Sequence, residues 1–107
     1  MHYDIIIVGT GPSGIFTALE MNRHRPEKKI LMIEKGNRLE ERVCPKRERG
    51  YCSHCGTCNI TSGFSGAGAF SDGKLILSPE IGGNLGEYIR EELPQLIQYV
   101  DGIYLSY

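Results

Sequence analysis

The chain of 107 residues lacks a long hydrophobic run and lacks an excess of charge of either sign. The apolar run IIIV near the N-terminus is far too short for a signal peptide or a membrane span, and no positive region precedes it. A formal net charge of -1 gives no electrostatic reason to expect nucleic acid or an anionic membrane as a partner. We therefore expect a single-domain cytoplasmic protein that binds neither.

Disulfides are not expected either, because the cytoplasm keeps thiols reduced. The four cysteines, Cys44, Cys52, Cys55 and Cys58, have the spacing C-x7-C-x2-C-x2-C. Four thiolates can hold a zinc ion or an iron–sulfur cluster, and two successive C-x2-C steps resemble a cluster-binding run more than a zinc ribbon. Basic residues nearby favour thiolates and hence a redox-active dithiol. Metal binding at these four residues, thiol redox chemistry and plain reduced thiols all stay open.

Glycine, by contrast, is abundant, with 14 of the 107 residues. The stretch VGTGPSG places Gly9, Gly11 and Gly14 in G-x-G-x-x-G spacing. In a dinucleotide-binding turn Gly9 lets the chain leave its strand sharply, Gly11 lets a pyrophosphate approach the backbone, and Gly14 lets the helix pack closely. Pro12 fixes φ at the helix start, and the N–H groups of Gly11 and Ser13 face the anion at the helix N-terminus.

The sequence around this motif supports it. The apolar runs at residues 3–8 and 29–34 predict two buried parallel strands. Between them, apolar residues recur at helical spacing after Pro12, and Pro26 is expected to end this helix. Glu34 ends the second strand at the position where a carboxylate accepts hydrogen bonds from ribose hydroxyls and repels a 2′-phosphate. This pattern predicts an α/β fold with a βαβ unit. The alternative is a glycine-rich turn that binds no nucleotide, with Glu34 simply solvated.

The C-terminal part predicts less regular structure. Residues 74–77 could form a short strand, and apolar residues recur at helical spacing over residues 85–100. Pro94 should bend that helix or divide it in two, because it cannot donate a backbone hydrogen bond. The last residues, IYLSY, are a strand-like run.

Several stretches resemble one protein family. DIIIVGTGPSGIFTALEM resembles the N-terminal FAD-binding segment of two-dinucleotide-binding flavoproteins, and IEKG resembles the end of their second strand. With the CP…C-x2-C-x2-C cluster, SGFSGAGAFSDGKL and SPEIGG, the whole chain resembles the uncharacterised FAD-dependent dehydrogenases, also called NAD(FAD)-utilising dehydrogenases. The resemblance implies a Rossmann-like FAD-binding unit, with residues 63–74 along the pyrophosphate and flavin. It implies these cofactor-binding residues: Gly9, Gly11, Pro12, Ser13, Gly14, Glu34, Lys35, Gly66, Ala67 and Gly68.

The resemblance also sets the expected domain organisation. Members of that family have chains several times longer, so we expect residues 1–107 to be an incomplete N-terminal part of the FAD-binding domain, with a charged, cysteine-containing insertion at residues 37–62. The expected function is binding of the ADP part of FAD in a flavin-dependent oxidoreductase, without activity of this piece alone. No catalytic residue, substrate or electron partner can be assigned. The alternatives are an electron-transfer module built on the cysteines and an inactive truncated product.

Overall fold

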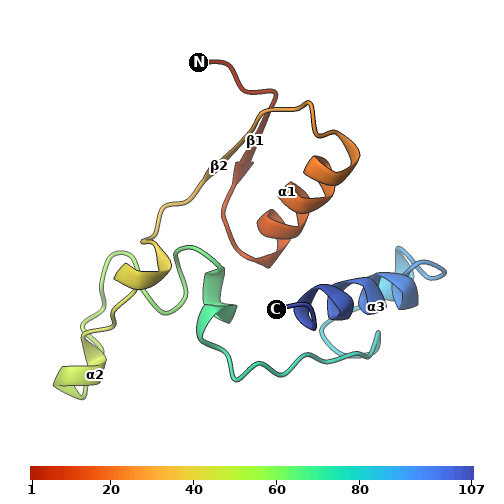
Figure 1. Ribbon diagram of the computed structural model, residues 1–107. Helices are drawn as coiled ribbons and strands as arrows, with labels where there is room; N and C mark the ends of the chain where they lie inside the picture. Colours follow the sequence, from red (N-terminus) through yellow and green to blue (C-terminus); the bar gives the residue numbers. More distant parts are fainter. The chain divides into compact units, whose positions relative to one another are not determined.

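Two short runs of largely β-branched residues form a parallel sheet in the computed structural model, which describes residues 1–107. Strand β1 (Ile5–Val8) lies beside β2 (Ile30–Ile33), with Ile5 opposite Ile30 and Val8 opposite Ile33. Helix α1 (Pro12–His24) connects the two strands, as Figure 1 shows. Since parallel neighbours need a crossover, this order explains why a helix separates them. The fold is mixed α/β, with two strands and three α-helices.

Helix α1 begins and ends where the prolines allow. Pro12 occupies its first turn, where a missing N–H costs nothing, and the helix ends at His24, two residues before Pro26. The helix packs against β1, so Ile5 and Ile7 are half-buried. The other face of the strand is open, since Ile6 is 59% and Val8 is 83% exposed. The expectation of strands buried on both faces is therefore wrong for this structure.

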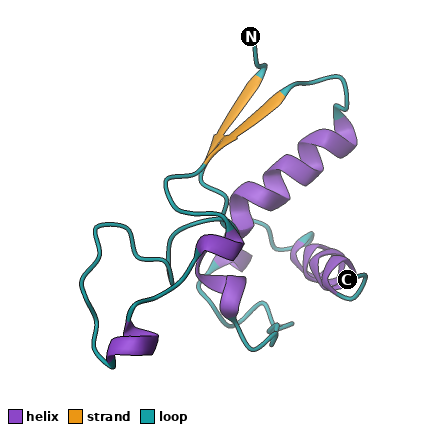
Figure 2. Ribbon diagram, turned by 60° about the vertical axis from the view of Figure 1, so that its left-hand side comes forward, coloured by secondary structure: helices purple, strands orange, loops and turns teal.

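Between β2 and Ser71 the chain contains only short helices. These are the 3₁₀ helix η1 (Leu39–Glu41), the single-turn helix α2 (Lys46–Arg49) and the 3₁₀ helix η2 (Gly66–Phe70). Loops connect them, as the teal segments of Figure 2 show. This irregular backbone is what the charged, glycine-rich sequence predicts.

The chain divides into two compact units, Met1–Ser71 and Asp72–Tyr107. The second unit contains the 3₁₀ helix η3 (Leu85–Glu87) and helix α3 (Leu93–Tyr104). Pro94 lies in the first turn of α3, so the helical pattern is divided, as expected. None of the helices of the chain has the length and apolar character needed to cross a bilayer.

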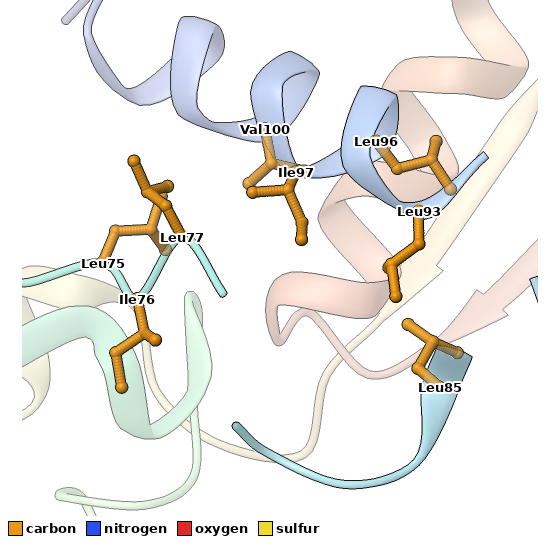
Figure 3. Close-up of a pocket in the computed structure, with 8 residues that line it drawn as sticks. All are labelled: Leu75, Ile76, Leu77, Leu85, Leu93, Leu96, Ile97 and Val100. Carbon is orange, nitrogen blue, oxygen red and sulfur yellow. The ribbon is translucent and has the colours of Figure 1, made fainter. Parts of the chain in front are cut away.

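Two predictions for the second unit are wrong. Residues 74–77 form no strand, because no neighbouring strand is there to pair with them. The expected C-terminal strand is absent as well, since α3 continues to Tyr104. Leu93 is the buried hydrophobic residue of this unit, and beside it lies an apolar pocket of about 200 Å³, drawn in Figure 3. Its lining residues are Leu75, Ile76, Leu77, Leu85, Leu93, Leu96, Ile97 and Val100.

Candidate functional site

The first glycine turn is joined to the end of β2. The N–H of Gly9 donates a 2.7 Å hydrogen bond to the carbonyl oxygen of Ile33. Gly9 has a φ of 98°, in the region that residues other than glycine rarely adopt. The chain therefore leaves β1 through a conformation that requires glycine, at the place where β2 ends.

Gly14 permits close packing of α1. A Cβ atom there would overlap the carbonyl oxygen of Gly9 and would lie 3.4 Å from Cγ2 of Ile7. The helix can approach the strand this closely only because Gly14 has no side chain.

Gly11, by contrast, faces open space. No atom lies within 4 Å of the position that a Cβ of Gly11 would take, and Gly11 caps the helix without a side chain. The first hydrogen bond of the helix runs from the N–H of Ile15 to the carbonyl oxygen of Gly11 at 3.0 Å. The backbone N–H groups of Gly11, Ser13 and Gly14 have no acceptor within the protein. The positive end of the α1 dipole thus presents three free donors, the arrangement that binds anions.

Glu34 points at the same turn. Its Oε2 accepts hydrogen bonds from the N–H of Thr10 at 2.9 Å and from the Thr10 hydroxyl at 3.1 Å. Its Oε1 accepts one from the N–H of Gly36 at 2.9 Å. These bonds lower the pKa of Glu34 to about 2, the Thr10 N–H contributing most, so the carboxylate is charged at neutral pH. Lys35, the next residue, is exposed and has no ion pair.

The second glycine-rich segment lies against the first. The N–H of Ser65, itself at a left-handed φ of 71°, donates a 2.9 Å hydrogen bond to the carbonyl oxygen of Thr10. A Cβ on Gly66 would lie 3.2 Å from Cα of Gly11. The space that the missing side chain of Gly66 leaves is therefore used by the protein's own backbone. Ala67 and Gly68 follow in η2 and are exposed.

Arg42 holds this second segment in place, and sequence reasoning missed it. It is only 6% exposed, and its guanidinium donates to the carbonyl oxygens of Asn59, Ile60, Phe64 and Gly66 at 2.7–2.8 Å. Its Cζ also lies 4.9 Å from the centroid of the Phe70 ring. The planar fork of arginine suits such multiple bonding. In the sequence nothing distinguishes Arg42 from the other basic residues of its charged segment.

The four cysteines are all free thiols, and no three metal-ligating side chains of the chain come together as a binding group. Cys44 is half-buried, whereas Cys52, Cys55 and Cys58 are exposed. Hydrogen bonds, chiefly from the N–H of Thr61, lower the pKa of Cys58. Binding of zinc or an iron–sulfur cluster at these residues stays a prediction.

Comparisons with known proteins give little further information. No protein-family model matches the sequence, and no solved structure matches it. A protein of Clostridium beijerinckii, described only as uncharacterized, is 34% identical over an alignment of 98 residues, and the match covers 88% of this chain and 18% of the relative. The chain thus spans about a fifth of the length of the curated relative that it matches.

Proposed function

We propose that the unit Met1–Ser71 binds the ADP part of FAD, as the N-terminal portion of a flavin-dependent oxidoreductase with a Rossmann-like FAD-binding unit. One observation carries the proposal: the free donors at the start of α1 and the charged carboxylate of Glu34 meet at a single glycine turn. A dinucleotide carries both a diphosphate and a ribose diol, which are the groups that these donors and this carboxylate would bind.

The diphosphate would lie against Gly11. Its approach needs bare backbone, and the open space at the Cβ position of Gly11 provides it. The N–H groups of Gly11, Ser13 and Gly14 would donate to the phosphate oxygens, and Pro12 would keep the first turn of α1 in place. The donors proposed for this half of the ligand are thus free of acceptors within the protein.

The ribose would bind at Glu34. Its carboxylate already accepts from Thr10 and Gly36, so a ribose hydroxyl has to replace one of these donors. The hydroxyl of Thr10 is the donor that can turn away, since the two backbone N–H groups are fixed by the turn. The charge of Glu34 also disfavours a 2′-phosphate, which favours FAD over a phosphorylated nicotinamide dinucleotide.

The family resemblance supports FAD rather than NAD. The second glycine-rich segment, which the resemblance assigns to the flavin side, contacts the first turn at Gly66. Bound FAD would supply hydride and electron transfer, whereas this chain would supply binding and orientation. The chain covers only 18% of the length of its relative, so the proposal assigns it no substrate and no electron partner.

Titration of FAD against the chain, followed by quenching of flavin fluorescence, tests the proposal. We expect saturable binding that Gly11→Val abolishes, because the new side chain occupies the position of the diphosphate. Gly56→Val is the matched control, since a Cβ at Gly56 also meets open space. Equal FAD affinity of the Gly11→Val and Gly56→Val variants would refute the assignment.

A further inference from the structure

A second pocket of unit Met1–Ser71 is formed by different residues from those of the glycine turn. It has a volume of about 430 Å³ and lies between the cysteine-containing segment and the end of η2. Its lining residues are three cations, a thiol, an amide and two apolar side chains. In that order they are Arg42, Lys46 and Arg47, then Cys44, Asn59, Ile60 and Phe70.

The positive charges in this pocket have no acidic partner. Lys46 and Arg47 are exposed and form no ion pair. Arg42 is bonded only to neutral carbonyl oxygens. The acidic residues nearest in sequence, Glu41 and Glu48, do not line the pocket. Three uncompensated cations around one concave surface attract an anion.

Two of the remaining lining residues, Ile60 and Phe70, are apolar. The ring of Phe70 lies against the guanidinium of Arg42 and is 47% exposed, and Ile60 has the same exposed fraction. A planar aromatic body packs favourably against an exposed aromatic ring such as that of Phe70. The pocket therefore combines charge for an anionic group with a surface for a planar apolar body.

We infer that this pocket binds small aromatic anions, such as arene carboxylates, with the thiol of Cys44 beside the bound molecule. The inference does not rest on FAD binding, because none of the lining residues is among the ten cofactor-binding residues that the resemblance implies. Phe70 alone lies in the 63–74 segment that the resemblance assigns to the pyrophosphate and flavin. Cys44 supplies a covalent reporter at the site.

Reaction with two aromatic disulfides tests the inference. In each reaction the thiolate attacks one sulfur of the reagent, a protein–aryl disulfide forms, and an aryl thiolate leaves. Dithiobis(nitrobenzoate) carries two carboxylates, whereas dithiodipyridine is neutral. The ratio of the two rates at one cysteine cancels that cysteine's thiolate fraction and leaves the effect of the reagent's charge.

Two variants of the full chain report on single thiols. One retains Cys44 and has serine at the other three positions, and the other retains exposed Cys52. We expect the anionic-to-neutral rate ratio to be roughly tenfold higher at Cys44, and to fall with added salt. We also expect naphthoate to slow the anionic reaction at Cys44 and not at Cys52. Equal ratios at the two cysteines would overturn the inference.

Charge variants make the test specific to the pocket. The double variant Lys46→Gln, Arg47→Gln should lower the anionic-to-neutral rate ratio at Cys44 to the value at Cys52. Arg25→Gln with Lys29→Gln removes the same charge from elsewhere in the unit, and it should leave the ratio high. All four positions are exposed, so the fold should survive, as circular dichroism would verify. A Cys44 ratio that is insensitive to Lys46 and Arg47 would contradict the inference.

Discussion

The N–H of Thr10 donates a 2.9 Å hydrogen bond to the carboxylate of Glu34, 24 residues further along the chain. Thr10 is only 4% exposed, and its carbonyl oxygen accepts from Ser65 in the second glycine-rich segment. One residue of the turn thus joins the end of β2 to that segment. The geometry that would position a dinucleotide is therefore the geometry that stabilises this unit.

Acid should weaken the fold through Glu34. Its pKa is lowered from 4.5 to about 2, so its stabilising contribution is complete above pH 4.5 and is lost as the pH falls towards 2. Glu34→Gln should be less stable than the wild type at neutral pH, and the difference in free energy of unfolding should shrink over that range. Urea unfolding at several pH values measures this difference. Glu40→Gln, a change at an exposed glutamate, should show no such convergence.

The same substitution should have opposite effects at two helical glycines. Gly14→Ala places a Cβ against the carbonyl oxygen of Gly9, so we expect a loss of roughly 1–3 kcal/mol in the free energy of unfolding. Gly102→Ala in α3 meets no atom within 4 Å and should instead stabilise its helix by up to about 1 kcal/mol. Thermal unfolding of both variants shows whether each substitution lowers or raises the stability. Stabilisation by Gly14→Ala would contradict the close packing of α1.

Loss of Arg42 should release the second glycine-rich segment. Arg42→Gln leaves carbonyl oxygens of that segment without their donor, and we expect a cost of roughly 2–3 kcal/mol. Arg42→Lys should retain little of the stability that is lost in Arg42→Gln, because an ammonium group lacks the planar, forked set of donors of a guanidinium. Hydrogen exchange at the Ser65 amide should accelerate in both variants and stay slow in Arg38→Gln. Unchanged protection of Ser65 in Arg42→Gln would show that Arg42 does not hold the segment.

Glu34 should set the preference for an unphosphorylated ribose. We expect ADP to bind roughly tenfold more tightly than its 2′-phosphorylated analogue, because the charged carboxylate repels the extra phosphate. Glu34→Gln should reduce this preference, and calorimetric titration with the two nucleotides measures it. The same preference in the wild type and in Glu34→Gln would place the ribose elsewhere.

The first crossover was predictable from the sequence because local signals decide it. The apolar runs around Ile5 and Ile30 placed the strands to within two residues, and Pro12 and Pro26 bounded the helix. The role of Gly14 in close packing was predictable from its spacing to Gly9 and Gly11, and the structure shows α1 close to β1 at this residue. Periodicity, proline and glycine act over a few residues, so a single sequence reveals them.

Other features depend on contacts between distant residues, which the sequence does not reveal. Residues 74–77 have strand-like composition, yet a strand forms only when a partner is present to pair with it. The run after Gly102 is equally apolar, but it continues the helix that precedes it. The role of Arg42 arises from four carbonyl groups supplied by residues 59–66, and no local pattern encodes that convergence.

Amide-resolved NMR of the chain during titration with ADP tests the central claim most directly. If the diphosphate lies on the turn, the largest shifts will be at the amides of Gly11, Ser13 and Gly14, with smaller ones at Thr10 and Gly36 beside Glu34. These shifts should disappear in Gly11→Val. Shifts confined to other residues, or none at saturating ADP, would contradict the account.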